Sequence, residues 1–217
     1  MRRPAHPVRV LVVGSHASAK TTLGSWIAEA WRLPFLAEVA RVVLEKRPGP
    51  KLTFDKLRLD VDATNDYQRD VMRAQIEAEA AIAAKPEARR GYVSDRSFDN
   101  LAYAAKHAEV VAELSRTPEL RRYVRQLRAD VDTGRAVVFF TRPHPSMFVQ
   151  DGGRAVGDLD LAGTHAIDGM VQLLLELGDG TKRIKYHPIE SPDPKMRRYS
   201  VENVLEPLLG PRQKAKT

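Results

Sequence analysis

The stretch VRVLVVGSHASAKTTLGSW, residues 8–26, decides the fold of this chain. Its first part, Val10 to Val13, is a continuous run of aliphatic and β-branched residues, which is typical of a parallel strand buried on both faces. A loop of small residues begins at Gly14, and Thr21 to Trp31 has its apolar residues at helical spacing. The stretch therefore predicts a strand, a tight loop and a helix in direct succession.

The loop between these elements resembles the template G-x-x-x-x-G-K-[ST] of a phosphate-binding loop. In such a loop, successive backbone N–H groups surround a phosphate, and the start of the helix adds positive potential. Lys20 is expected to reach the β- and γ-phosphates, and the Thr21 hydroxyl is expected to bind Mg²⁺. The residues expected to bind the nucleotide are Gly14, Ser15, His16, Ala17, Ser18, Ala19, Lys20, Thr21 and Thr22.

Ala19 departs from the template, which has glycine at this position. A Cβ atom here crowds backbone that has to approach a phosphate closely. We therefore expect phosphate binding, and we leave open whether Ala19 lowers activity. The alternative interpretation is a helix N-terminus that is merely rich in small residues.

The composition is that of an ordinary globular domain, with 43% hydrophobic and 29% charged residues over 217 positions. No apolar run approaches the roughly 18 residues of a membrane span, and no signal peptide is recognisable. The absence of cysteine excludes disulfides and thiolate metal sites. We expect a single domain over residues 1–217, located in the cytoplasm and without a membrane partner.

The net charge of +7 is concentrated at the two ends of the chain. Arg2, Arg3, Arg212, Lys214 and Lys216 contribute five of the seven positive charges, so that residues 1–7 and 211–217 are basic tails. The body of the chain is close to neutral, and the charge is therefore weak support for binding to DNA.

Strand and helix patterns alternate along the rest of the chain. Strands are expected at 10–13, 35–38, 91–94, 136–141 and 183–189, and the main helices at 21–31, 39–46, 64–84, 98–112, 117–131, 159–177 and 201–209. Ser97 is a plausible N-cap for the helix at 98–112. This alternation predicts an α/β fold with a parallel sheet, whose ligands bind at the carboxyl ends of the strands.

Polar residues follow four of the predicted strands at this edge of the sheet. They are Gly14, Glu38, Asp95 and the pair Thr141-Arg142. A phosphate loop, two carboxylates and an arginine at the end of the fourth strand thus lie where a ligand is expected. The proline- and glycine-rich segment 142–157 has the composition of a mobile loop.

Four segments together resemble the P-loop kinases related to the nicotinamide riboside kinase domain of bifunctional NAD regulators, and more distantly deoxynucleoside and thymidylate kinases. They are GSHASAKTTL at 14–23, FLAEVAR at 35–41, YVSDRSFDNLAYA at 92–104 and DGGR at 151–154. The resemblance implies a three-layer α/β/α fold with sheet order 2-3-1-4-5 and a lid at 142–157. It also implies ATP and Mg²⁺ as cofactors.

Asp95 ends a strand where a kinase needs a carboxylate near the metal and the acceptor hydroxyl, and it is a candidate for both catalysis and metal binding. Arg96 resembles the arginine that contacts substrate or phosphate in related nucleoside kinases. Glu38 matches the acidic position that meets the acceptor hydroxyl in those enzymes. The structural alternatives are a helix-capping role for Asp95, ion pairs of Arg96 with Glu38 or Asp95, and a surface ion pair between Glu38 and Arg41.

Arg41, Gln75 and Tyr103 are further candidates for contact with the substrate, although ordinary packing explains the last two equally well. Arg154 is the candidate catalytic residue of the lid, because an arginine on a glycine-hinged loop reaches a phosphoryl group only after closure. Arg142 is a second candidate at the nucleotide. The alternative for both arginines is a mobile surface position.

These observations lead to three hypotheses of function. The first is an ATP- and Mg²⁺-dependent kinase acting on a hydroxyl of a nucleoside, a nucleotide or a molecule like nicotinamide riboside. The second is a kinase whose acceptor hydroxyl belongs to DNA or a modified base within it, favoured by the basic helix at 118–131 and the tails. The third, motivated by Ala19, is a nucleotide-binding regulator with little turnover. The oligomeric state stays open, with a homodimer among the options.

Overall fold

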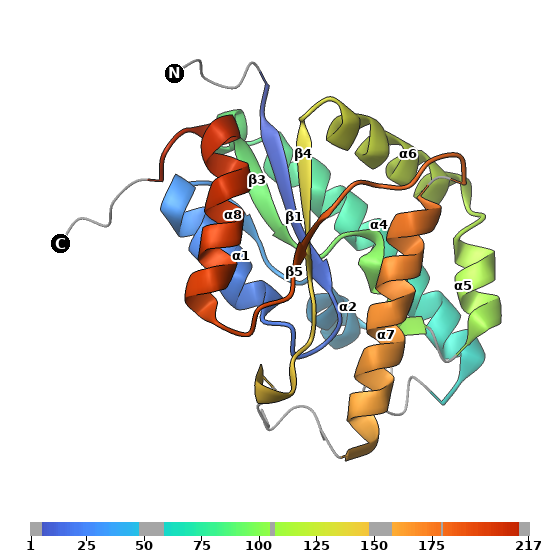
Figure 1. Cartoon of the computed structure of the whole chain (residues 1–217). Helices are drawn as coiled ribbons and strands as arrows, with labels where there is room; N and C mark the ends of the chain where they lie inside the picture. The colour runs from blue at the N-terminus through green and yellow to red at the C-terminus, as the bar shows by residue number, and fades with distance from the viewer. Residues whose placement is uncertain (1–5, 48–58, 105–106, 148–157, 179, 213–217) are drawn as a thin grey trace.

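The structure is a computed structural model and describes residues 6–47, 59–104, 107–147, 158–178 and 180–212. One sheet of five parallel strands lies at its centre (Figure 1). The strands are β1 (Val8–Gly14), β2 (Phe35–Leu36), β3 (Gly91–Asp95), β4 (Ala136–Thr141) and β5 (His187–Ile189). Their order, β2-β3-β1-β4-β5, confirms the expected sheet.

Helices cover both faces of this sheet, and Figure 1 has α1 and α8 on one side of it and α4, α6 and α7 on the other. The α-helices are α1 (Lys20–Trp31), α2 (Ala40–Lys46), α4 (Val61–Ala83), α5 (Ala108–Leu114), α6 (Pro118–Asp132), α7 (Asp158–Leu177) and α8 (Pro194–Leu209). Short 3₁₀ helices are η1 (Pro86–Arg90), η2 (Phe98–Ala104) and η3 (Pro145–Met147). None of the described helices combines the length and the apolar character that crossing a membrane requires.

The three layers follow from the alternation of side chains along the central strand β1. Val10 and Val12 belong to the core that contains Ile27 of α1 and residues of α8. Leu11 and Val13 belong to the opposite core, together with residues of α6 and α7. Because successive side chains of a strand point to opposite faces, one apolar run supplies both cores.

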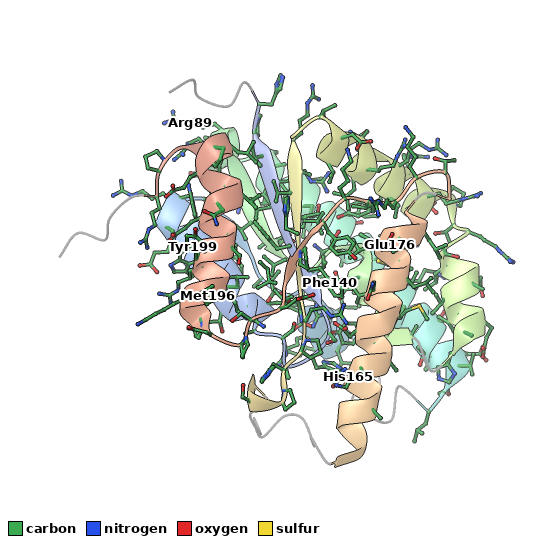
Figure 2. All side chains as sticks on the ribbon, viewed as in Figure 1. Arg89, Phe140, His165, Glu176, Met196 and Tyr199 are labelled. Carbon is green, nitrogen blue, oxygen red and sulfur yellow. The ribbon has the colours of Figure 1, made fainter. Side chains whose placement is uncertain are left out.

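α8 illustrates how a helix divides between core and solvent. Val201, Leu205 and Leu209 are buried in the core with α1, whereas Met196 and Tyr199 are exposed on the outer surface (Figure 2). The helix begins seven residues earlier than expected. Its start is set by Pro194 at the first position and by the Asp193 carboxylate, which accepts the Lys195 N–H at 2.8 Å.

The register of the parallel strands brings the expected strand ends together. Val12 of β1 pairs with Asp95 of β3, and Gly14 pairs with Thr141 of β4. Gly14, Asp95 and Thr141 therefore share one edge of the sheet, at its carboxyl end. β2 pairs with β3 and brings the segment that carries Glu38 to the same edge.

The prediction of a single helix at 98–112 is wrong. The segment forms the 3₁₀ helix η2 and then α5, and the Ser97 hydroxyl shares a hydrogen bond of 2.6 Å with the Tyr123 hydroxyl. The Asp99 carboxylate accepts the N–H of Ser97 at 2.6 Å and the N–H of Gly14 at 3.2 Å. This long-range contact ties the start of the segment to the phosphate loop, and the sequence pattern alone does not reveal it. Of the expected lid, residues 148–157 lie outside the described part of the chain.

A substitution at Gly14 can test how closely β1 and β4 approach each other. A Cβ atom at Gly14, which has φ +148°, would lie 2.3 Å from the Thr141 carbonyl oxygen. We therefore expect Gly14→Ala to lower the free energy of unfolding by roughly 3 kcal/mol, because backbone atoms cannot move aside. The measurement is chemical denaturation followed by circular dichroism.

Gly169→Ala is the matched control for this substitution. Gly169 lies in α7 with no atom within 4 Å of an added Cβ, so the same change should raise the free energy of unfolding by about 0.5–1 kcal/mol. Equal effects of the two substitutions would contradict the close approach described for Gly14.

Candidate active site

The phosphate loop joins β1 to α1 and is held in place from three sides. The Gly14 N–H donates to Asp99 of η2, as described above. The hydroxyls of Ser18 and Thr141 share a hydrogen bond of 2.9 Å. The Ser18 carbonyl accepts a hydrogen bond of 2.6 Å from Arg197 of α8. The conformation of the loop therefore depends on η2, β4 and α8 together.

Two alanines of the loop adopt left-handed backbone conformations. Ala17 has φ +49° and Ala19 has φ +55°. An L-residue with a Cβ atom adopts this region at a cost of roughly 1–2 kcal/mol, which glycine avoids. The departure from the template at position 19 therefore appears in the structure as backbone strain, in the residue that precedes α1.

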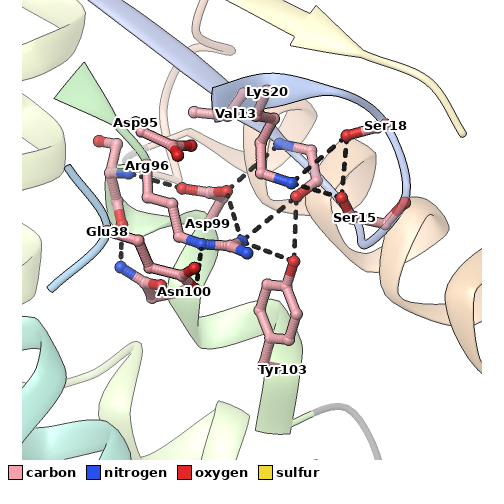
Figure 3. Close-up of polar contacts among 12 residues, drawn as sticks. Val13, Ser15, Ser18, Lys20, Glu38, Asp95, Arg96, Asp99, Asn100 and Tyr103 are labelled. Carbon is pink, nitrogen blue, oxygen red and sulfur yellow. Dashed lines mark hydrogen bonds and ion pairs between the residues drawn. The ribbon is translucent and has the colours of Figure 1, made fainter. Parts of the chain in front are cut away.

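Lys20 is the first residue of α1, and its ammonium group is directed back into the loop. Nζ donates to the Ser15 carbonyl and, at 3.3 Å, to the Ser18 hydroxyl (Figure 3). Burial lowers the pKa of Lys20 to about 7, and the nearby Arg96 charge acts in the same direction. The cost of burying the positive charge of Lys20 is thus only partly offset by its neighbours, and an anion in the loop would stabilise the charged form of the amine.

Thr21 and Asp95 form the pair expected to hold a metal. The Thr21 hydroxyl donates to Asp95 Oδ2, and Asp95 Oδ1 is buried without a hydrogen-bond partner among the described residues. Mg²⁺ prefers such hard oxygen ligands and commonly takes one or two protein ligands, the remainder being phosphate and water. Within the described part of the chain no cluster of three metal-ligating side chains exists. The pair therefore fits a Mg²⁺ ion that arrives with a nucleotide.

Arg96 follows Asp95 in the chain, and its guanidinium connects several elements (Figure 3). Its Nε forms an ion pair with Glu38 at 2.9 Å, and its Nη1 donates to the Tyr103 hydroxyl at 2.6 Å. The same Nη1 lies 3.6 Å from Asp99 Oδ2 and 3.5 Å from the Gly14 carbonyl oxygen. The structure thus brings Glu38, Arg96 and Tyr103 together beside the phosphate loop. The ion pair of Arg96 with Glu38 is the one named as its structural alternative, and contact of these residues with a substrate stays a prediction.

The Arg96 guanidinium is almost fully buried, with 3% of the side chain exposed. Burial alone lowers the pKa of an arginine, but Tyr103, Glu38 and Asp99 outweigh it and raise the pKa of Arg96 above its ordinary value. Burial raises the pKa of the Tyr103 hydroxyl to about 12, so that it remains a hydrogen-bond donor. The Tyr103 hydroxyl accordingly donates to the Gly14 carbonyl at 3.3 Å.

The backbone of Arg96 also has an unusual conformation, with φ +99°. Its carbonyl oxygen accepts hydrogen bonds from the Ser94 hydroxyl at 2.8 Å and from Gln75 Nε2 at 3.2 Å. Gln75 Nε2 also donates to Ser94 at 3.1 Å and to Glu79 at 2.9 Å. Gln75, expected to contact the substrate, is fully buried and supports Arg96 from behind, and its contact with an acceptor stays a prediction.

The other predicted residues occupy distinct positions around this centre. Arg41 is half-exposed and lies 4.0 Å from Glu38. Arg142 forms an ion pair of 2.9 Å with Asp168 of α7 and donates to Gln172, so it does not extend freely into solvent. The His16 ring packs edge-on against Tyr103, and Thr22 is exposed on α1. Arg154 lies outside the described residues.

Sequence reasoning missed three residues that organise the site. The sequence pattern assigns no role in the site to Asp99, Arg197 or Asp168. Asp99 acts through the Gly14 N–H, 85 positions away, and no local pattern predicts that contact. Arg197 is 179 positions from its Ser18 partner, and no local pattern predicts such a contact.

Solved structures with the same fold are P-loop kinases and related proteins, although the identities are low. The chain matches a NadR protein in complex with NR at 19% identity and TM-score 0.64, covering 98% of this chain and 54% of that one. It matches a deoxyadenosine kinase from M. mycoides with bound dATP at 10% identity and TM-score 0.52, covering 92% and 99%. It matches the YorR protein of Bacillus subtilis, in complex with phosphorylated GDP, at 11% identity and TM-score 0.51, covering 92% and 97%.

The fold and the site thus define a protein of the P-loop kinase fold, as the sequence resemblance implied. The family model of an AAA domain matches residues 9–169, and the chain belongs to this family. No curated protein matches the sequence. The chain spans about half the length of the NadR protein.

The strain at Ala19 leads to a prediction about stability. Ala19→Gly should raise the free energy of unfolding by about 1 kcal/mol, because glycine adopts φ +55° without a steric penalty. Chemical denaturation measures the change. In α4, Ala80 is exposed and helical, and Ala80→Gly should lower the same quantity by about 0.5–1 kcal/mol. A loss of stability in Ala19→Gly would contradict the strain.

Proposed function

We propose that this protein is an ATP- and Mg²⁺-dependent phosphotransferase whose acceptor is a hydroxyl of a nucleoside-like small molecule. The observation that carries this proposal is the joint placement of two unlike groups at one edge of the sheet. The hydrogen-bonded pair of Thr21 and Asp95 lies beside the phosphate loop, and the ion pair of Arg96 and Glu38 lies next to it. The first pair suits a metal–nucleotide complex, and the second suits an acceptor.

On the nucleotide side, the loop amides and Lys20 bind and orient the β- and γ-phosphates. Thr21 and Asp95 would hold Mg²⁺, which neutralises charge on the phosphates during transfer. Arg142 is a candidate for further contact with the nucleotide, and Arg154 for a contact during transfer. Phosphoryl transfer depends mainly on positioning and electrostatic stabilisation, and these side chains supply both.

On the acceptor side, the charge of Arg96 is already balanced. Glu38 and Asp99 both lie within 4 Å of its guanidinium, so that Arg96 offers little net charge to a second phosphate. This balance favours an uncharged or cationic acceptor, such as a nucleoside, over a nucleotide. Arg41, which is exposed and beside Glu38, and Tyr103 are the further candidates for contact with it.

Glu38 is the candidate for orienting the acceptor hydroxyl and accepting its proton. Its Oε1 accepts from Arg96 at 2.9 Å, its Oε2 lies 4.0 Å from Arg41 Nε, and the side chain is 20% exposed. The two oxygens of a carboxylate together offer about four lone-pair sites, so Glu38 can accept a hydroxyl proton beside its contacts with Arg96 and Arg41. The NR, dATP and phosphorylated GDP in the three similar structures support a nucleoside-like ligand for this fold.

The two alternatives are separable from this proposal by experiment. Saturable ATP binding without transfer to any acceptor would support a regulator. Transfer to DNA, with a steep salt dependence of DNA binding, would support the DNA kinase. The experiment is a screen of nucleosides, nucleoside monophosphates and DNA with ATP and Mg²⁺, followed by mass spectrometry. The proposal expects product with a nucleoside.

The two carboxylates should have separable roles. Asp95→Asn should lower both acceptor phosphorylation and background ATP hydrolysis, by about 100-fold or more, because both reactions need the metal ligand. Glu38→Gln should lower acceptor phosphorylation by about 100-fold and leave background hydrolysis nearly unchanged, because water needs no acceptor contact. Steady-state rates of both reactions in both variants provide the measurement.

Lys20→Ala is the reference variant for these rates, and it should lose both reactions and weaken ATP binding. Loss of hydrolysis in Glu38→Gln would place Glu38 at the metal instead. Unchanged phosphoryl transfer in Lys20→Ala would contradict the proposal that the protein is a phosphotransferase.

The low pKa of Lys20 predicts that nucleotide binding takes up a proton. Above pH 7 the free amine is mostly neutral, and a bound polyphosphate raises its pKa. Affinity should therefore fall as the pH rises above about 7, with uptake of about one proton at pH 8.5. Isothermal titration calorimetry in two buffers of different ionisation enthalpy measures this uptake. In Lys20→Arg, which stays charged, the uptake should disappear, and its persistence would exclude Lys20 as its source.

A further inference from the structure

Arg197, in the first turns of α8, lies between three segments that meet at the phosphate loop. Its side chain is almost fully buried, and the neighbouring Met196 is exposed on the outer surface (Figure 2). Nη1 donates to the Ser18 carbonyl at 2.6 Å, Nη2 donates to the Arg142 carbonyl at 3.1 Å, and Nε donates to the Ser191 carbonyl. One guanidinium thus fixes the loop, the end of β4 and the segment before α8.

The charge of Arg197 has no counter-ion in the described part of the chain. Its hydrogen-bond acceptors there are backbone carbonyls, and it forms no ion pair with a described carboxylate. Arg96 is equally buried but has Glu38 and Asp99 beside it. Accordingly, burial lowers the pKa of Arg197, whereas the pKa of Arg96 is raised. A buried charge without a partner is costly, and a bound anion near Arg197 would supply the partner that the described residues do not.

The contact with Ser18 also determines where the next amide points. The structure has no cis peptide bond in its described part, so the Ser18 C=O and the Ala19 N–H lie in one peptide plane and point in opposite directions. Because Arg197 holds the carbonyl toward α8, the Ala19 N–H is directed away from α8. The same hydrogen bond helps to hold Ala19 in its left-handed conformation. The template has glycine at this position, which adopts that conformation without strain.

We propose that Arg197 is a positioning residue of the nucleotide site, which orients the Ala19 amide toward the phosphates and supplies a buried positive charge behind the loop. This inference rests on the proposed binding of ATP. Arg197 of α8 is thereby added to the positively charged residues predicted for this site. Those residues are Lys20 of the loop, Arg142 after β4 and Arg154 of the expected lid. The charge of Arg197 acts across the loop and favours the more highly charged of two nucleotides.

The experiment compares ATP and ADP binding, each with Mg²⁺, by calorimetry in the full-length protein. Arg197→Gln, which removes the charge, should raise the Kd of ATP by about tenfold or more and raise that of ADP less. Arg197→Lys, which keeps the charge and loses the forked geometry, should weaken both nucleotides and retain the wild-type ratio of the two constants.

Arg198→Gln is the matched control, because this neighbour is exposed and carries the same charge. It should leave both constants within about twofold of wild type. Circular dichroism verifies folding. If Arg197→Gln does not fold, Arg197→Lys decides alone, and unchanged ATP binding in that variant overturns the inference.

Equal weakening of ATP and ADP in Arg197→Gln would overturn the electrostatic role, and unchanged binding would overturn the inference altogether. These outcomes leave the proposed function intact as long as the wild type binds ATP and Lys20→Ala does not. A wild-type protein that binds neither nucleotide would overturn both proposals.

Discussion

The buried guanidinium of Arg96 is the charge on which the geometry of the site depends. A fully buried cation requires opposite charge and satisfied donors, and here these come from separate elements. Glu38 follows β2, while Asp99 and Tyr103 lie on η2, and the Gly14 carbonyl belongs to the end of β1. Breaking any of these contacts would leave a buried charged or polar group less well compensated in a dry interior, so the segments hold their mutual positions.

This arrangement is supported by a second polar layer beneath it. Glu79 of α4 accepts hydrogen bonds from Arg9 at 2.7 Å, Tyr123 at 2.7 Å and Tyr92 at 3.0 Å, and it also accepts from Gln75. Gln75 in turn holds the carbonyl of Arg96, whose φ of +99° is otherwise unfavourable for a residue with a side chain. Backbone strain of this kind persists only where surrounding contacts determine it, and here they connect α4, α6 and β3 to the site.

The fold could be predicted from the sequence because its determinants are local. The apolar run at Val10 to Val13, the small-residue loop and Lys20 lie within a dozen positions, and strand ends in a parallel sheet converge by geometry. Asp95 and Glu38 were placed at this edge for that reason, whereas Arg96 was named from the family resemblance. The contacts of Asp99 with Gly14 and of Arg197 with Ser18 join residues 85 and 179 positions apart. Such contacts are set by packing of the layers, and neither periodicity nor a motif contains them.

The distribution of buried charge divides the site into two unlike halves. On the side of Glu38, the cation Arg96 is matched by carboxylates. On the side of the loop, burial lowers the pKa values of both Lys20 and Arg197. A polyphosphate bound at the loop would stabilise the charged forms of both side chains. In the proposed function, the balanced charge beside Glu38 gives a second anion little to gain there, which would favour an acceptor of low negative charge beside a charged donor.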